Sequence, residues 1–163
     1  MSSLRLIYAT TPFHTKNDLF DAVYESLFDR IATDLTADRP FQSFAELAGW
    51  QLRKIVEWLV QNPSYARAQS ELIQWAARHR PDFALRTYVQ SVERTVAYFS
   101  KCAVEVHSDM IEAVARMSLV LIDGLLNSWY AELNIRTLGT NLKNASSALE
   151  AYATVISNST VQV

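Results

Sequence analysis

The three histidines are the first residues to consider for metal chemistry. His14, His79 and His107 are widely spaced, no pair has the H-x-x-x-H spacing of helical zinc ligands, and none adjoins the cysteine. His79 stands between Arg78 and Arg80, and positive charge is favoured at the C-terminal end of a helix. We therefore predict no metal site and no cofactor, and we interpret the basic triplet as a solvated helix end.

Nucleophilic chemistry has little support. No serine lies in a G-x-S-x-G turn, and no glycine-rich phosphate loop occurs. Cys102 follows Lys101, but a single neighbouring charge is weak grounds for a reactive thiol, so a structural cysteine is the simpler interpretation. The sequence predicts no catalytic residues and no enzyme. A single cysteine also excludes an intramolecular disulfide and is typical of a reducing compartment.

Asp123 is the acid whose position needs an explanation. It lies within the apolar run Met117–Leu126, where an unpaired carboxylate is costly. It can pair with a basic side chain, cap a neighbouring backbone, or face a pocket or a subunit interface, and the sequence leaves these alternatives open. Gly124 costs about 1 kcal/mol relative to alanine inside a helix. We interpret Gly124 as a point where another helix approaches closely at an interface.

Composition limits the fold and the partners. The chain has 163 residues, of which 50% are hydrophobic and 20% charged, as expected for one globular domain. A net charge of -2 gives no general attraction to nucleic acid or to an anionic membrane. There is no long uncharged apolar stretch and no signal peptide, so we expect a cytoplasmic protein without a membrane partner. Three glycines and four prolines are too few for a β-rich domain, which favours long helices.

Apolar residues at helical spacing divide the chain into an irregular remnant, residues 1–14, and a helical domain, residues 15–163. Thr15 with Asp18 and Ser43 with Glu46 are typical of helix N-termini. Proline stands at the first position of two further helices, and Asn62 is the expected N-cap of the first of these. We predict an all-α bundle of about six helices, which begin near residues 16, 44, 63, 81, 104 and 141. The helix that begins at residue 81 is expected to bury Leu85, Tyr88, Val92, Val96 and Phe99.

Two short motifs resemble those of TetR-family transcriptional regulators. FHTKNDL (residues 13–19) is similar to the F-x-[ST]-K-x-x-L junction between the DNA-recognition helix and the long connecting helix. LIDGLL (residues 121–126), followed by Trp129, is similar to the I-D-G-L segment in the penultimate helix, which lies in the dimer-forming bundle. Asn62-Pro63 and Arg80-Pro81-Asp82 resemble the family's middle-helix openings. The resemblance covers residue 13 to about residue 156.

This resemblance implies a TetR C-terminal-domain-like fold, with an effector-binding and dimerisation core whose helix-turn-helix is truncated. Family members carry a complete helix-turn-helix before the junction, whereas only twelve residues precede Phe13 here. Arg5 is the only basic residue before His14, and Pro12 would disrupt a recognition helix. We therefore expect no sequence-specific DNA binding by this chain. Ligand-linked movement of the first long helix would be its mechanism.

The resemblance also implies a cavity for a small apolar or aromatic effector among the middle helices. Aromatic walls with a few polar groups are typical of such cavities. The candidate ligand-binding residues are Trp50, Arg53, Trp58, Gln69, Trp75, Tyr88, Arg94, Tyr98 and Asn127. The alternative is that these aromatics fill the core, as they do in any helical interior. The chain would then be a helical-bundle interaction protein with no small-molecule ligand.

A homodimer is expected because the helix predicted over about residues 104–133 is apolar on more than one side from Met117 onward. A helix that is apolar on two sides must bury both, and a second copy is the expected cover. The family's bundle implies interface positions on the last two helices. The candidate dimer-interface residues are Met117, Leu121, Gly124, Leu125, Leu149, Tyr152 and Ile156.

Overall fold

The computed structural model describes residues 40–102 and 106–159, preceded by residues 15, 18, 21–23, 25, 26, 30 and 31. The remnant predicted for residues 1–14, most of the FHTKNDL motif and much of the predicted first helix lie outside the described residues. The described positions from 18 to 31 are all helical.

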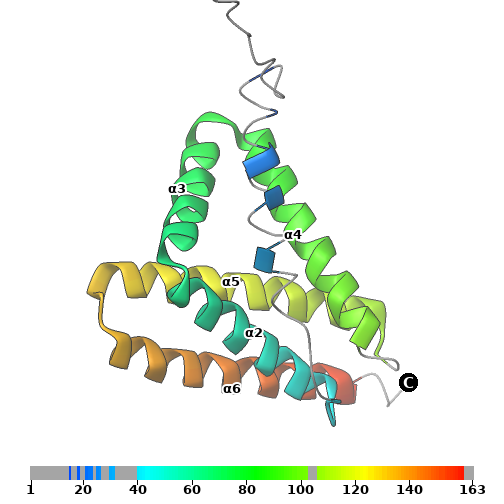
Figure 1. Ribbon diagram of the computed structural model, residues 1–163. Coiled ribbons are helices and arrows are strands. Elements are labelled where there is room, and N and C mark those ends of the chain that lie inside the picture. The colour runs from blue at the N-terminus through cyan, green and yellow to red at the C-terminus, as the bar shows by residue number, and fades with distance from the viewer. Residues whose placement is uncertain are drawn as a thin grey trace, which may run out of the picture.

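The described part of the chain is all-α, which confirms the predicted fold class. Its complete helices are α2 (Phe44–Gln61), α3 (Pro63–His79), α4 (Pro81–Cys102), α5 (Ser108–Glu132) and α6 (Ile135–Ser159), and it contains no strand. In Figure 1, α5 and α6 run antiparallel along the base, and α2 packs against both. Helices α3 and α4 rise from this base and meet at an apex, which gives the molecule a triangular outline.

Most of the residues predicted to cap helix N-termini do so. The Thr15 hydroxyl accepts from the Asp18 backbone N–H at 3.1 Å, and the Asp18 carboxylate accepts from the Thr15 N–H at 2.8 Å. Ser43 caps α2 by accepting from the Glu46 N–H at 3.1 Å. Asn62 differs from the prediction, because its side chain makes no cap bond to α3 and donates instead to the Trp58 carbonyl at 2.8 Å. Asn62 is still the N-cap residue of α3, as predicted, because its carbonyl accepts from the Ala66 N–H at 3.1 Å. Its side chain, however, closes the end of α2.

Helix α6 begins at Ile135, six residues before the predicted start near residue 141. The cause is Asn134, whose side-chain oxygen accepts from the backbone N–H groups of Arg136 and Thr137 at 3.0 and 3.2 Å. The residue before it, Leu133, has a φ of 50° and ends α5 in the left-handed conformation. One leucine and one asparagine therefore make the tight reversal between two long helices.

The main core lies around α2. Leu47, Leu52, Val56 and Leu59 on this helix are almost completely buried, and α2 packs chiefly against α6 and α5. A second, smaller cluster joins α3 to α4 nearer the apex, where Ala76 and Phe83 are buried against half-buried neighbours. The space between these two clusters is where the packing is incomplete.

Candidate ligand-binding cleft

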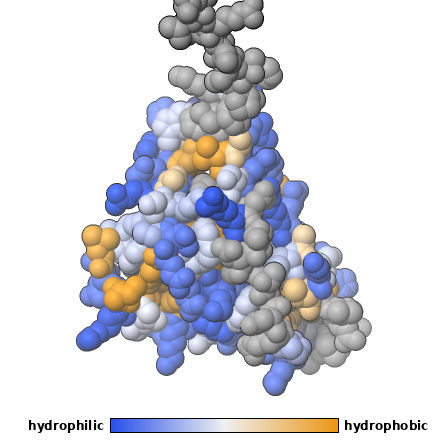
Figure 2. All heavy atoms as spheres, viewed as in Figure 1, coloured by the Kyte–Doolittle hydropathy of each residue, from blue (hydrophilic) through white to orange (hydrophobic). Residues whose placement is uncertain are grey.

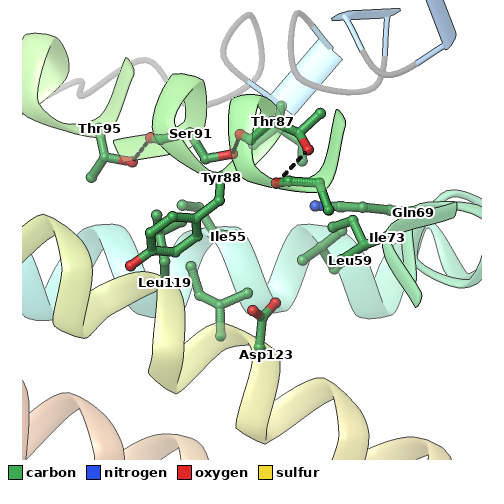
Figure 3. Close-up of a pocket in the computed structure, with 13 residues that line it drawn as sticks. Ile55, Leu59, Gln69, Ile73, Thr87, Tyr88, Ser91, Thr95, Leu119 and Asp123 are labelled. Atoms are coloured by element: carbon green, nitrogen blue, oxygen red, sulfur yellow. Dashed lines mark hydrogen bonds between the residues drawn. The ribbon is translucent and has the colours of Figure 1, made fainter. Parts of the chain in front are cut away.

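A cleft of about 100 Å³ lies beneath the α3–α4 apex, between the two clusters (Figure 3). Helices α2, α3, α4 and α5 all contribute to its walls, and Ile31 contributes from the segment before α2. The lining is mostly apolar. Its residues are Ile31, Ile55, Leu59, Gln69, Ile73, Ala84, Thr87, Tyr88, Ser91, Thr95, Leu119, Ile122 and Asp123.

One wall of the cleft carries a row of three buried hydroxyl groups from successive turns of α4. Thr87 donates to the carbonyls of Phe83 and Ala84, at 2.8 and 3.0 Å. Ser91 donates to the Thr87 carbonyl at 2.8 Å, and Thr95 donates to the Ser91 carbonyl at 2.9 Å. Figure 3 shows these side chains lying in line along the helix. We call Thr87, Ser91 and Thr95 the hydroxyl row.

The hydrogen bonds of the hydroxyl row decide what it can offer a ligand. A hydroxyl group has one donor hydrogen and two acceptor lone pairs. Each of the three hydrogens is directed to a carbonyl of the preceding turn. The hydrogens of this wall are therefore engaged by the backbone of α4 itself.

Asp123 approaches the cleft from α5, on the opposite side from the hydroxyl row (Figure 3). The residue as a whole is exposed, but the atoms packed around its carboxyl group remove part of its hydration. This desolvation raises the pKa of the Asp123 carboxyl above its ordinary value. Among the described residues no basic side chain lines the cleft, so no cation offsets the charge there. Of the alternatives that the sequence left open for Asp123, the structure favours a position facing a pocket.

Tyr88 forms the edge of the cleft between α4 and α5. The Arg116 guanidinium of α5 lies over its ring, with 5.8 Å between the guanidinium carbon and the ring centroid. Glu112, one turn earlier on α5, holds Arg116 through a 2.7 Å ion pair. The Arg116 charge is therefore engaged by Glu112 and by the Tyr88 ring.

Two of the nine predicted ligand-binding residues, Gln69 and Tyr88, line this cleft. The three tryptophans lie elsewhere and contact other aromatic rings. Trp50 is buried in the main core beside Phe41, and Trp58 packs edge-on against Tyr65. Trp75 stacks on the ring of His79, with centroids 5.2 Å apart. These positions are those expected when aromatics fill the core.

The remaining predicted ligand-binding residues lie outside the lining of the cleft. Arg53 pairs with Glu150 of α6 at 2.9 Å, and Arg94 and Asn127 are exposed. Tyr98 packs beside Phe99, and its hydroxyl has no hydrogen-bonding oxygen or nitrogen within the described part of the chain. Burial, reinforced by the Cys102 thiol one turn later, raises the pKa of Tyr98 to about 12.

The predicted dimer-interface residues separate into two groups. Leu125 and Leu149 are buried in the chain's own core, and Leu121, Tyr152 and Ile156 are half-buried against it. Met117 and Gly124 are exposed, and an added Cβ on Gly124 would meet nothing within 4 Å. A close approach at Gly124 is therefore not made by the described residues of this chain, and its place in an interface between copies stays a prediction.

Sequence reasoning missed the hydroxyl row because it assigned only apolar side chains of α4 to the core. Val92 and Phe99 are buried as predicted and Val96 is half-buried, but the other two predicted residues are not. Leu85 is 64% exposed and Tyr88 is also exposed, whereas the row is buried. The sequence signal that was missed is a set of residues at every fourth position of α4, with a phenylalanine at each end and hydroxyl residues between them. Its members, all buried, are Phe83, Thr87, Ser91, Thr95 and Phe99. Serine and threonine can satisfy their hydroxyl groups on the helix backbone, so they can be buried as readily as small apolar residues.

Comparisons with known proteins identify no relative. No protein-family model matches the chain, and neither a curated protein nor a solved structure matches it.

Within the described residues, none of the helices has the length and apolar character needed to cross a membrane. The same residues contain no group of three or more histidine, cysteine, aspartate or glutamate side chains that could hold a metal ion.

Proposed function

We propose that this chain is the effector-binding and dimerisation core of a TetR-like transcriptional regulator. The observation that carries the proposal is the cleft beneath the α3–α4 apex, where four helices enclose an apolar space with a few directed polar groups. Ligand sites between helices have this composition. The two sequence motifs that resemble the TetR family add support but are short.

The position of Ile31 suggests how a ligand would act. Ile31 belongs to the segment predicted as the first long helix, and it lines the cleft. Earlier in the same segment, the Asp21 carboxylate lies 3.9 Å from the Arg86 guanidinium of α4. A ligand in the cleft would thus touch the element that leads back to the FHTKNDL junction. For regulation, the ligand must bind one arrangement of that element more tightly than another.

The experiment is a small-molecule screen by thermal unfolding, with the cleft tested by a matched pair of variants. Ser91→Leu places a larger side chain in the cleft, whereas Ser100→Leu makes the same change at an exposed position of α4. Effectors should stabilise the wild-type protein and the Ser100→Leu variant but not the Ser91→Leu variant. The proposal fails if no compound stabilises the protein, or if both variants respond alike.

The dimer is part of the same proposal. Its support is an α5 surface that the described chain leaves uncovered, where Val120 is 59% exposed and Met117 is 38% exposed. These residues and Gly124 are spaced by three and four positions, so they lie on one side of the helix. A second copy of this chain is the occupant that the homodimer prediction requires.

A second candidate is an interaction protein without a small-molecule ligand. The cleft volume favours it, because about 100 Å³ is below the ~300–1,000 Å³ of most ligand pockets. Apolar side chains are also exposed at the α5–α6 turn, at the left of the base in Figure 2, where Leu133 and Ile135 lie. In this case the screen would find no effector, and a protein partner would protect the turn from hydrogen exchange.

A further inference from the structure

Asp123 is the one charged side chain among the described residues that line the cleft. Figure 3 shows its carboxyl group directed away from α5 and into the cleft. Burial is the only cause of its raised pKa, so no hydrogen bond and no cation from the described chain stabilises the charge. The stabilisation that the carboxylate still has must therefore come from water.

The walls around Asp123 offer it no replacement for that water. The hydrogens of the hydroxyl row are bonded to backbone carbonyls of α4, so the row donates none of them to the carboxylate. Most of the other lining residues are aliphatic. They are Ile31, Ile55, Leu59, Ile73, Ala84, Leu119 and Ile122. A molecule that packs on these side chains would bring further apolar surface against the Asp123 carboxyl group.

Resting on the proposed ligand-binding function, we infer that the cleft binds a compact, uncharged apolar molecule and that protonation of Asp123 strengthens this binding. An apolar molecule removes water from the carboxyl group without replacing its hydrogen bonds. The cost of that loss is much larger for a carboxylate than for a neutral carboxylic acid. Ligand binding and proton uptake therefore favour each other, and the coupling is reciprocal.

The volume of the cleft limits the ligand to about one ring. A cavity of roughly 150 Å³ is enough for benzene in a protein interior. The cleft measures about 100 Å³ and is open at one side, so a single ring can enter with part of it at the mouth. Benzene is a suitable probe because it has no charge at any pH. Any pH dependence of its binding must then originate in the protein.

The pH dependence is assigned to Asp123 from the groups that surround it. The described residues that line the cleft from α2, α3 and the segment before α2 are not titratable. Helix α4 contributes Tyr88, and a tyrosine hydroxyl is ordinarily neutral from acid to neutral pH. On α5, Glu112 and Arg116 pair with each other at 2.7 Å and lie outside the lining. The charged Arg67 and Glu71 of α3 also lie outside it.

The experiment follows benzene binding to the full chain by backbone amide NMR at pH 4.5 and pH 7.5. The expected result is amide shifts at the residues that line the cleft, with severalfold higher affinity at pH 4.5, where more of Asp123 is protonated. The resonance of the Asp123 carboxyl carbon gives a second measurement, because benzene should raise the pKa of this group further. Ser91→Leu places a larger side chain in the cleft and should abolish both effects.

Two matched variants separate the Asp123 charge from other effects of acid. Asp123→Asn keeps the side-chain shape without the charge, so it should bind benzene more tightly than the wild-type protein at pH 7.5 and should show no pH dependence. Glu132→Gln removes an equal charge at an exposed position of α5 and should keep the wild-type pH dependence. The comparison at pH 7.5 tests the inference even if acid unfolds the protein.

Benzene that binds in the cleft equally well at both pH values, or more tightly at pH 7.5, would overturn the inference and leave ligand binding intact. An Asp123→Asn variant that binds benzene no more tightly than the wild-type protein at pH 7.5 would overturn it too. If benzene binds under neither condition, the inference fails, and the broader screen with Ser91→Leu decides whether effector binding fails with it.

Discussion

The Glu150 side chain of α6 lies directly over Gly49 of α2, where it occupies the space that a Cβ atom would need. One turn along α2, Arg53 donates to the same carboxylate at 2.9 Å. The two helices can therefore cross closely at Gly49 while an ion pair spans them beside the crossing. Neither residue was singled out from the sequence for this role, although α2 and α6 form the largest helix contact of the described chain.

The first prediction concerns this crossing. Gly49→Ala should gain helix propensity, about 1 kcal/mol at most, but its methyl group displaces Glu150 and separates the carboxylate from Arg53. The ion pair is half exposed and is worth less than about 1 kcal/mol. In the wild-type protein, we expect Gly49→Ala to leave the free energy of unfolding almost unchanged or to lower it. In a Glu150→Ala background, where the Glu150 side chain no longer occupies the space, we expect the same change to raise it by about 1 kcal/mol. Urea unfolding of the double-mutant cycle measures both effects.

The cycle contains its own control. If the crossing requires glycine only because of Glu150, the two substitutions must be coupled, with the pair more stable than the sum of the single changes predicts. Additive effects would show that Gly49 and Glu150 do not constrain each other.

The second prediction concerns Leu133 at the end of α5. Its φ of 50° is unfavourable for a leucine, and its side chain is 73% exposed, so little packing is lost when it is removed. Leu133→Gly should therefore raise the free energy of unfolding by about 1 kcal/mol. Thermal or urea unfolding measures the gain. Glu132→Gly changes the preceding residue, which is still helical, and should lower the free energy of unfolding. A loss of stability in both variants would mean that Leu133 contributes packing that outweighs its backbone strain.

The third prediction concerns the uncovered side of α5. If this surface binds a second copy, Val120→Glu should convert a dimer to a folded monomer, because an unpaired charge would be buried at the contact. Sedimentation velocity at micromolar concentration gives the assembly state, and circular dichroism confirms that the fold is kept. Val89→Glu, at an exposed position of α4, is the matched control and should leave the dimer intact.

The choice of Val120 depends on the structure. Leu125 is one of the interface positions predicted from the sequence and Val120 is not, but Leu125 is buried in the chain's own core. A glutamate at Leu125 would unfold the chain rather than separate two subunits. A wild-type protein that already sediments as a monomer would refute the homodimer.

The sequence predicted the helices well where the signal is local. Ser43 and Pro63 each mark a helix start within a residue, because caps and prolines act through their own backbone neighbours. The start of α6 was missed because its cap, Asn134, follows α5 after a single leucine in a left-handed conformation. Nothing in an apolar pattern distinguishes such a reversal from a continued helix.

The cleft was harder to predict than the helices. An aromatic-rich middle segment suggested tryptophan walls, yet Trp50 and Trp75 are used in packing and the cleft is lined by hydroxyl groups and aliphatic side chains. Burial of the hydroxyl row depends on how α4 is rotated against α5. That rotation is decided by tertiary contacts, while the hydropathy of Leu85 and Tyr88 points to the wrong face. Asp123 was identified as an acid that needs an explanation, because a charge within an apolar run stands out in any fold.

The last prediction concerns the effect of the Asp123 charge on the free energy of unfolding. Desolvation raises the pKa of the folded Asp123 carboxyl above its ordinary 3.8, so the folded state holds the proton more tightly than the unfolded state does. Below pH 3.8 both states are protonated and the charge costs nothing. As the pH rises, the unfolded state ionises first and is favoured, and the full cost is reached above the folded pKa.

Asp123→Asn removes this cost, so the variant should match the wild-type protein near pH 3 and exceed its stability at pH 7. Urea unfolding at both values measures the difference. A wild-type protein that is more stable than the variant at pH 7 would mean that a cation already pairs with Asp123 in the free protein.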